Sequence, residues 1–193
     1  MNNLTQRILT GSAYVTLMLI ATIQSNFIGS FFALVAVIGT FELKKIFEKQ
    51  KLDFDVWPSI IIGLITYVSI LYKEVHIYLF SGIFIYFISS LYRSKTNALQ
   101  LLGGLFFSTT YIFIPLALAI PIGQQSGSYD YKILVGLFIL IWSSDSWAYV
   151  SGRLFGKRKL FERLSPKKTW EGFWGSVILT SITGYVLAKT GFG

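Results

Sequence analysis

The chain has 193 residues, of which 53% are hydrophobic and only 13% are charged. A soluble domain carries about 25% charged residues, and here the charges cluster between long apolar runs, so the composition predicts an integral membrane protein. The sequence has no cysteine and a single histidine, His76, which excludes disulfides, thiolate metal sites and multi-histidine metal sites.

Seven apolar runs follow one another along the chain, and a helix needs about 20 mostly apolar residues to cross a bilayer. We therefore predict an all-α, polytopic membrane protein with about seven transmembrane helices. The fifth run contains Pro115 and Pro121, which predict a kink in its helix. The predicted helices span Ile8–Gln24, Phe27–Leu43, Val56–Tyr72, Val75–Tyr92, Ala98–Gly123, Tyr131–Ser151 and Gly172–Thr190.

The distribution of lysine and arginine predicts a cytosolic N-terminus. With that orientation, 14 of the 17 basic residues fall on the cytosolic side of the membrane, as the positive-inside rule requires. The net charge of +8 is thus explained by short loops between apolar runs, and we expect no nucleic-acid partner. We expect a multi-pass protein of a bacterial cytoplasmic membrane, and the pattern leaves a homodimer open.

The cytosolic loop between the last two predicted helices is more basic than orientation requires. It reads GRLFGKRKLFERLSPKKTWE and holds seven Lys or Arg against two Glu. Such an excess suits either acidic lipid headgroups or a polyphosphate site. The spacing from Gly152 to Gly156 and Lys157 is too short for a Walker-type nucleotide loop.

Within this loop, Ser165 and Pro166 form a helix start signal, since Ser is a good N-cap and Pro suits the first helical position. We therefore predict that a helix begins there, with Lys167 and Lys168 in its first turn. Cations are unfavourable at that end of a helix unless an anion such as phosphate binds there. The alternative is that both lysines only anchor the helix at the membrane surface.

Asp145 lies inside the sixth apolar run, near its cytosolic end. A carboxylate within a spanning helix is costly and usually faces a polar cavity. Mg²⁺ prefers one or two carboxylates together with substrate phosphates, so Asp145 is a candidate metal ligand. The alternative is a structural Asp145 that is paired with Arg153 or with a hydroxyl. The helical face that carries it comprises Ile141, Asp145, Ala148, Tyr149 and Gly152.

The aromatic and acidic residues nearby also allow two readings. Trp170 and Trp174 suit an aromatic belt at the membrane surface, although one of them could stack on a nucleobase. Glu171 could be a partner of the helix dipole, or it could position a metal or a substrate hydroxyl. Glu42 is expected to form a local ion pair with Lys45.

With these residues in place, the run SSDSWAYVSGRLFGKRKLFERLSPKKTWEGFWGS resembles the core segment of the phosphatidate cytidylyltransferase (CDP-diglyceride synthase) family. Three ordered elements carry the resemblance: D-x-x-A-Y at Asp145–Tyr149, G-x-x-F-G-K-x-K-L at Gly152–Leu160, and S-P-x-K-T-W-E-G at Ser165–Gly172. The resemblance is tight over residues 141–180 and loose over the rest of the chain.

The resemblance implies an integral membrane enzyme that transfers CMP from CTP to phosphatidate, with a divalent metal such as Mg²⁺. The products would be CDP-diacylglycerol and pyrophosphate. The expected catalytic residues are Asp145, which also binds the metal, Lys167, Lys168 and Glu171. The expected substrate-binding residues are Arg153, Lys157, Lys159, Ser165, Thr169 and Trp170.

A further signature of the family, with H-G-G and D-R-x-D elements, has no counterpart in this sequence. We therefore expect a piece of a longer protein, with N-terminal transmembrane helices in residues 1–130 and the start of the cytidylyltransferase-like core in residues 131–193. Two other functions stay open. One is a CTP-dependent kinase of a lipid alcohol such as a polyprenol, and the other is a non-catalytic protein that binds acidic lipid.

Overall fold

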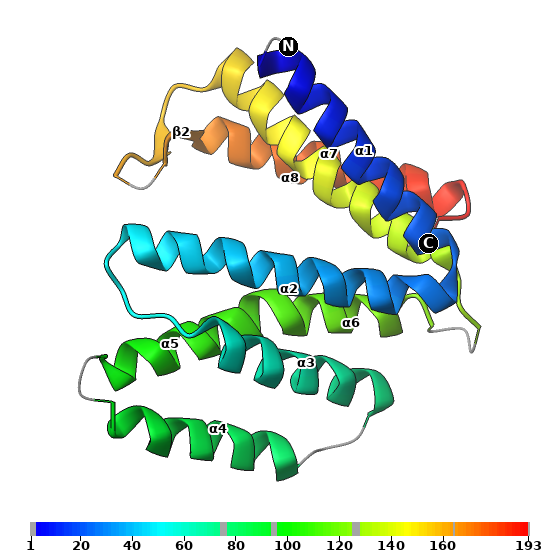
Figure 1. Cartoon of the computed structure of the whole chain (residues 1–193). Coiled ribbons are helices and arrows are strands. Elements are labelled where there is room, and N and C mark those ends of the chain that lie inside the picture. Colours follow the sequence, from blue (N-terminus) through cyan, green and yellow to red (C-terminus); the bar gives the residue numbers. More distant parts are fainter. Residues whose placement is uncertain (1–2, 74–76, 94–95, 125–127, 164, 193) are drawn as a thin grey trace. The chain divides into compact units, whose positions relative to one another are not determined.

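The computed structural model describes residues 3–73, 77–93, 96–124, 128–163 and 165–192. The single histidine, His76, lies outside the described residues. The chain divides into two compact units, residues 1–129 and residues 130–193. Figure 1 labels most elements of the two units.

Over its described residues, the N-terminal unit contains helices and the short loops that connect them, with no strand. Its fifth helical segment is one run of α5, a π-helical turn (η1) and α6. The elements are α1 (Asn3–Ile23), α2 (Ser25–Lys49), α3 (Val56–Tyr72), α4 (Ile77–Leu91), α5 (Ala98–Ser108), η1 (Thr109–Phe113) and α6 (Ile114–Ile122).

The C-terminal unit holds two long helices and a small β-ribbon between them in sequence. The ribbon is antiparallel and connects the end of the first helix to the start of the second. The elements are α7 (Tyr131–Phe155), β1 (Lys159–Phe161), β2 (Ser165–Thr169) and α8 (Trp170–Lys189).

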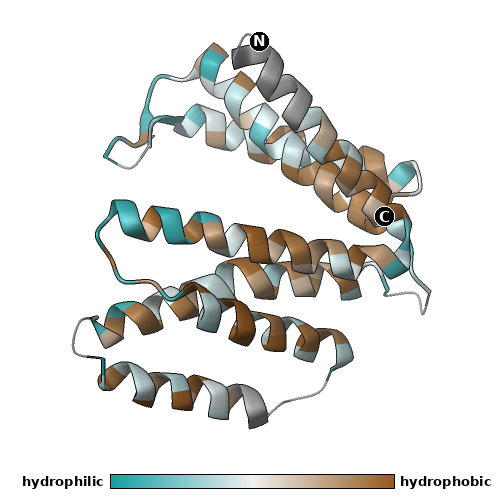
Figure 2. Cartoon of the chain, viewed as in Figure 1, coloured by the Kyte–Doolittle hydropathy of each residue, from teal (hydrophilic) through white to brown (hydrophobic). Residues whose placement is uncertain are grey.

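The apolar runs of the sequence coincide with the helices, as Figure 2 shows by the hydropathy of each residue. Among the described residues, three helical segments are long and apolar enough to cross a membrane: Ser25–Lys49, Ala98–Ile122 and Tyr131–Phe155. Shorter apolar helices lie at Gly11–Ile23, Val56–Tyr72 and Phe80–Leu91. The prediction of a largely helical membrane protein is thus confirmed, whereas the predicted number of membrane crossings stays a prediction.

The proline-containing segment has a π-helical turn at Thr109–Phe113, two residues before Pro115, and the predicted kink stays a prediction. Proline has no N–H to donate, and its ring crowds the carbonyl four residues earlier, so a regular α-helical ladder cannot continue through this position. The side-chain hydroxyl of Thr109 donates to the carbonyl oxygen of Leu105 at 2.9 Å, which adds a further local hydrogen bond. The segment therefore stays helical but changes its hydrogen-bond spacing.

Close packing of a glycine against an aromatic ring forms the centre of the N-terminal unit. A Cβ atom at Gly63 of α3 would lie 2.3 Å from ring carbons of Phe113, a side chain that is fully buried. The hydroxyl of Tyr67, one turn further along α3, donates to the carbonyl oxygen of Gly29 in α2 at 2.8 Å. Glycine at position 63 therefore leaves room for the Phe113 ring, and small residues at helix contacts are typical of membrane proteins.

A polar cluster joins the loop ends of this unit. Asp55, the residue before α3, accepts a hydrogen bond from the Tyr86 hydroxyl of α4 at 3.0 Å and pairs with Arg93 beyond α4. The neighbouring Asp53 carboxylate accepts from the backbone N–H of Asn97 at 2.6 Å, just before α5. The two carboxylates therefore hold the starts of α3 and α5 to the end of α4.

We predict that Asp55→Ala destabilises the protein by about 1–3 kcal/mol, because it leaves a partly buried hydroxyl and a guanidinium without their acceptor. The measurement is unfolding in detergent followed by circular dichroism. Glu48→Gln is the matched control, since Glu48 forms only an exposed pair with Lys44 at 3.5 Å, and such pairs contribute little. Equal stability of the two variants would contradict the bridging role of Asp55.

The expected local pair between Glu42 and Lys45 is confirmed, with 2.6 Å between the lysine Nζ and the carboxylate Oε1. Both side chains are exposed. The pair therefore stabilises the end of α2 locally, and the structure gives Glu42 no other partner among the described residues.

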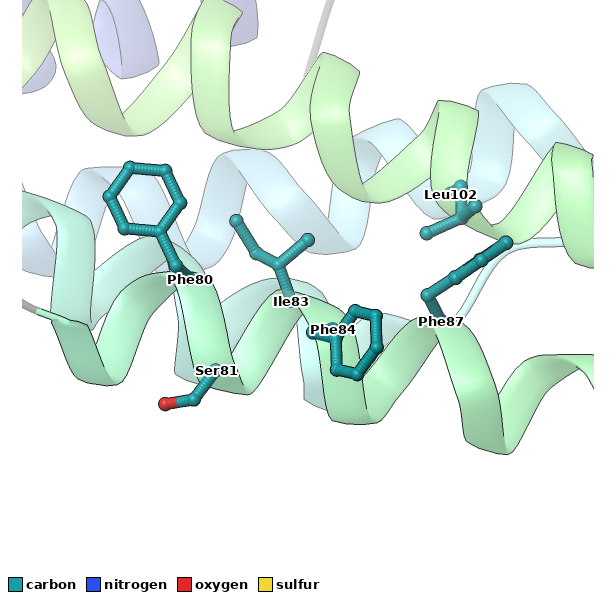
Figure 3. A pocket seen from close by; sticks show the side chains of 6 residues that line it. All are labelled: Phe80, Ser81, Ile83, Phe84, Phe87 and Leu102. Carbon is teal, nitrogen blue, oxygen red and sulfur yellow. The ribbon is translucent and has the colours of Figure 1, made fainter.

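An apolar depression of about 650 Å³ lies between α4 and α5. Figure 3 shows Phe87 and Leu102 approaching each other across it, while Ser81 points away. Its lining is almost wholly carbon, so it offers no group that would hold a charged ligand. The residues around it are Phe80, Ser81, Ile83, Phe84, Phe87 and Leu102.

The prediction that a helix begins at Ser165 and Pro166 is wrong. These residues belong to β2, and α8 begins five positions later, at Trp170, with Thr169 as its N-cap. Lys167 and Lys168 therefore lie on the strand, before the N-cap and outside the first turn of α8. Glu171 takes the place in the first turn instead, and a carboxylate is favourable there.

Candidate functional site

Helices α7 and α8 approach each other through small residues. A Cβ atom at Gly172 of α8 would lie 2.8 Å from the carbonyl oxygen of Ala148 and 3.1 Å from the Cα of Gly152, both in α7. One turn further, a Cβ at Gly175 would lie 2.2 Å from the Ser151 hydroxyl. Only glycine at these two α8 positions permits this packing without a shift of α7.

Thr169 connects the ribbon to both helices. It is the last residue of β2, and its hydroxyl accepts a hydrogen bond from the Gly172 N–H at 3.2 Å as the N-cap of α8. Its side chain is buried at 9% exposure against the end of α7, where a Cβ at Gly156 would lie 2.9 Å from the threonine Oγ1. The start of α8 is thereby fixed against the last turn of α7.

We predict that Gly172→Ala destabilises the C-terminal unit by about 1–3 kcal/mol, the usual cost of overpacking, because the added Cβ meets backbone atoms that cannot rotate away. Gly184→Ala is the matched control, since a Cβ at Gly184 would sit at an ordinary 3.5 Å from the Leu140 side chain. The measurement is unfolding of both variants in mixed micelles. A Gly172→Ala protein as stable as the control would contradict the close approach of the helices.

The carboxylate of Glu171 holds the loop that precedes β1. It accepts from the backbone N–H of Lys157 at 3.0 Å and from that of Arg158 at 3.2 Å. The amide of Lys157 is the largest cause that lowers the pKa of Glu171, with smaller contributions from the Glu171 and Arg158 amides and the Arg158 charge. The ionised carboxylate of Glu171 therefore acts as a clamp, because it holds the loop before β1 against the start of α8. The sequence did not suggest this role.

Since the pKa of Glu171 is lower in the folded protein than its ordinary value of 4.5, its stabilising effect is present above that value. The effect is lost as the pH falls through the lowered pKa. We predict that the amides of Lys157 and Arg158 are protected from hydrogen exchange at neutral pH, and that Glu171→Gln loses this protection at neutral pH. The measurement is hydrogen exchange by mass spectrometry.

The control for this experiment is Glu162→Gln, because Glu162 is exposed in the turn of the ribbon. It should leave exchange at residues 157 and 158 unchanged. Loss of protection in both variants, or in neither, would contradict the clamp.

A groove of about 940 Å³ runs along α7 and α8 and under β2. Charged side chains line it near the ribbon, whereas further along the helices its lining is uncharged and mixes aliphatic side chains with hydroxyls. The residues at the polar end are Asp145, Arg153, Ser165, Lys167, Lys168 and Thr169.

Asp145 lies well inside α7, whose last residue is Phe155, and it is exposed to the groove. Among the described residues, the structure records no hydrogen bond or ion pair to its carboxylate. The alternative of a structural pair with Arg153 therefore has no support, because the Arg153 guanidinium donates instead to the Tyr149 hydroxyl at 3.2 Å. The carboxylate of Asp145 is available to a ligand.

The structure thus brings six of the ten predicted site residues to one groove. The other four lie elsewhere: Lys159 donates to the Pro166 carbonyl across the ribbon at 2.6 Å, and Glu171 is bound to amides. The side chain of Trp170 packs edge-on against Phe173. The residues absent from the groove lining are Lys157, Lys159, Trp170 and Glu171.

Sequence reasoning missed the α8 side of the groove. Ser176 and Val177 contribute there, and the Ser176 hydroxyl lies 3.0 Å from that of Ser144 in α7. A small or hydroxyl residue recurs every four positions at Gly172, Ser176 and Thr180, and all three line the groove. This period is one helical turn, so it could have predicted the packed face of α8.

The sequence matches the model of the Cytidylyltransferase family over residues 5–191. The chain belongs to the Cytidylyltransferase family. The curated relatives of this family member include bacterial proteins named phosphatidate cytidylyltransferase. The one from Haemophilus influenzae is 38% identical over 100 residues, and the one from Aquifex aeolicus is 38% identical over 81 residues. The one from Bacillus subtilis is 26% identical over 94% of this chain.

The alignment with the Haemophilus influenzae relative covers 51% of this chain and 34% of that relative. The alignment with the Aquifex aeolicus relative covers 42% of this chain and 31% of that relative. The chain thus aligns with about a third of the length of these two relatives, and with 70% of the Bacillus subtilis relative. No solved structure shows significant similarity to the chain. Its apolar helices and its bacterial relatives indicate a bacterial membrane protein.

Proposed function

We propose that this protein transfers CMP from CTP to phosphatidate, forming CDP-diacylglycerol and pyrophosphate. The observation that carries the proposal is the α7–α8 groove, which joins a basic end bearing one carboxylate to an apolar stretch. A lipid phosphate and a nucleoside triphosphate need this combination, because both present phosphates while only one carries a hydrocarbon tail. Membership of the Cytidylyltransferase family and the names of the relatives support the same reaction.

In this proposal an oxygen of the phosphatidate phosphate attacks the α-phosphorus of CTP. A new bond forms between that oxygen and the phosphorus, the bond to the bridging oxygen breaks, and pyrophosphate leaves with the electron pair. Lys167, Lys168 and Arg153 hold the phosphates and balance their charge. Positioning and charge neutralisation supply most of the catalysis in phosphoryl transfers of this type.

Ser165 and Thr169 lie beside the lysines at the polar end of the groove, and we propose that they shape the phosphate site. The Thr169 hydroxyl already accepts from the Gly172 N–H, so its contribution is to orient β2. Three of the predicted substrate-binding residues lie outside the groove lining: Lys157, Lys159 and Trp170. We assign them to the rim of the site, facing either the membrane or the nucleotide. Glu171 acts in this proposal by holding the loop in place.

We also propose that a divalent cation such as Mg²⁺ binds with the substrates. Among the described residues, no group of three or more His, Asp or Glu side chains could hold a metal alone. Asp145 is a single free carboxylate in a phosphate-binding groove, which fits Mg²⁺ because this ion takes one or two carboxylates plus phosphate oxygens and water. The cation would neutralise phosphate charge, while Asp145 orients it.

The membrane arrangement forms part of the proposal. We infer seven crossings with the N-terminus in the cytosol of a bacterial cell, so that the basic ribbon meets cytosolic CTP at the surface of the cytoplasmic membrane. The concentration of basic residues in the proposed cytosolic loops supports this orientation. The homodimer remains a prediction, as does the absence of a nucleic-acid partner.

We predict that membranes carrying the complete reading frame that contains this chain incorporate label from the cytidine of CTP into lipid when phosphatidate is added. Asp145→Asn should lower kcat/KM by about 100-fold or more, and Lys168→Ala by about 10–100-fold, since each removes charge stabilisation at the transferring phosphorus. Lys189→Ala is the control, because Lys189 lies at the far end of α8, next to Tyr185.

Several outcomes would overturn the assignment. Transfer of label only from the γ-phosphate of CTP would identify a lipid kinase instead. No transfer of either label, with binding of acidic lipid that is insensitive to CTP and Mg²⁺, would identify a non-catalytic lipid-binding protein. Full activity of both variants would overturn the placement of the site in this groove.

A further inference from the structure

The groove extends well beyond the part that phosphates would fill. On α8 its lining runs from Gly172 to Gly184, which is about 18 Å along a helix that rises 1.5 Å per residue. The hydrocarbon depth of one bilayer leaflet is about 15 Å, half of the whole core. The groove is therefore long enough for a charged headgroup and a substantial part of a hydrocarbon chain.

The inner half of the groove combines aliphatic side chains with hydroxyl residues of α8 and carries no charged side chain among the described residues. Leu140 and Val177 line it with aliphatic side chains. The Ser181 hydroxyl donates a hydrogen bond to the Val177 carbonyl oxygen at 2.8 Å. The hydroxyl oxygen of Thr180 is itself buried, so the surface that Thr180 gives to the groove comes from its carbon atoms.

Gly184 and Leu140 face each other where the groove ends. A Cβ atom at Gly184 would lie at an ordinary contact distance of 3.5 Å from a methyl carbon of Leu140, and these two residues are the lining positions of α8 and α7 furthest from the ribbon. Because Gly184 has no side chain, the space beside Leu140 stays open to a ligand. The size of the residues at these two positions therefore sets the length of the groove.

We propose that the inner half of the groove binds one acyl chain of the lipid phosphate, and that Leu140 and Gly184 set the preferred chain length. This inference rests on the proposed function, and it adds the site of the hydrocarbon chain and the residues that select it. The continuity of the apolar stretch with Lys167 and Lys168 favours a ligand that is anionic at one end and apolar at the other. A nucleotide alone would leave the inner half unfilled.

The experiment measures binding of dioctanoyl and dioleoyl phosphatidate to the complete protein in nanodiscs, by competition against a fluorescent phosphatidate. The readout is the ratio of the two affinities. Gly184→Leu should lower the preference for the longer chain by about tenfold, because its side chain displaces roughly two methylene groups from the groove. Leu140→Ala should shift the ratio in the opposite direction, because it lengthens the groove.

Gly103→Leu is the matched control. Gly103 is an exposed glycine of α5 in the other unit, where an added Cβ would meet nothing within 4 Å, and the ratio should equal that of the unmodified protein. The opposite shifts of the two groove variants distinguish a chain-length site from general damage, which would lower both affinities together.

The inference is overturned if the unmodified protein binds phosphatidate while neither groove variant changes the ratio, and the proposed function then stands. A shift of the same size in the Gly103→Leu protein would overturn it as well. If the unmodified protein binds neither phosphatidate, the proposed function fails, and this inference fails with it.

Discussion

The C-terminal unit depends on the contact between the start of α8 and the end of α7. Thr169 caps α8 through the Gly172 N–H and packs against Gly156, while Gly172 lies directly on α7 beside Gly152. The hydrophobic effect supplies little attraction between helices within lipid, so close van der Waals packing and hydrogen bonds must hold them together. Every groove residue on α8 takes its position from this contact.

An irregularity in the ribbon explains why adjacent lysines can serve one site. In a regular strand, neighbouring side chains point to opposite faces, so Lys167 and Lys168 would diverge. The ribbon is irregular here: Lys159 pairs with Thr169 and Phe161 with Ser165, so a step of two residues on β1 faces a step of four on β2. Such bulges re-aim side chains, and both lysines line the groove.

The helices were largely predictable because apolar runs of spanning length have few alternatives, and α3 at Val56–Tyr72 matches its predicted bounds. The ribbon was not predictable from local signals. Ser165 and Thr169 are both acceptable N-caps, and the choice between them is made by packing of Thr169 against α7, which no local pattern records. One sign against a helix start at Ser165 was available, because it would place the positive charges of Lys167 and Lys168 at the unfavourable end of the helix dipole. The position of Asp145 in a groove was predicted because a carboxylate is energetically costly within an apolar helix. The residues that α8 contributes to the groove could not be predicted without knowing how α8 packs against α7.

The charge of the groove narrows what it can bind. Arg153, Lys167 and Lys168 face it together with the single carboxylate of Asp145, so the lining carries an excess of two positive charges. Like charges held together near a low-dielectric membrane repel one another more strongly than they would in bulk water, and an anionic ligand removes that cost. A monovalent anion would neutralise only half of this excess positive charge. Several linked phosphate groups would neutralise all of it, and their remaining negative charge would attract a divalent cation beside Asp145. The electrostatics therefore favour polyphosphate or paired phosphates at the polar end, and the aliphatic side chains further along the groove suit the lipid tail that the proposed reaction places there.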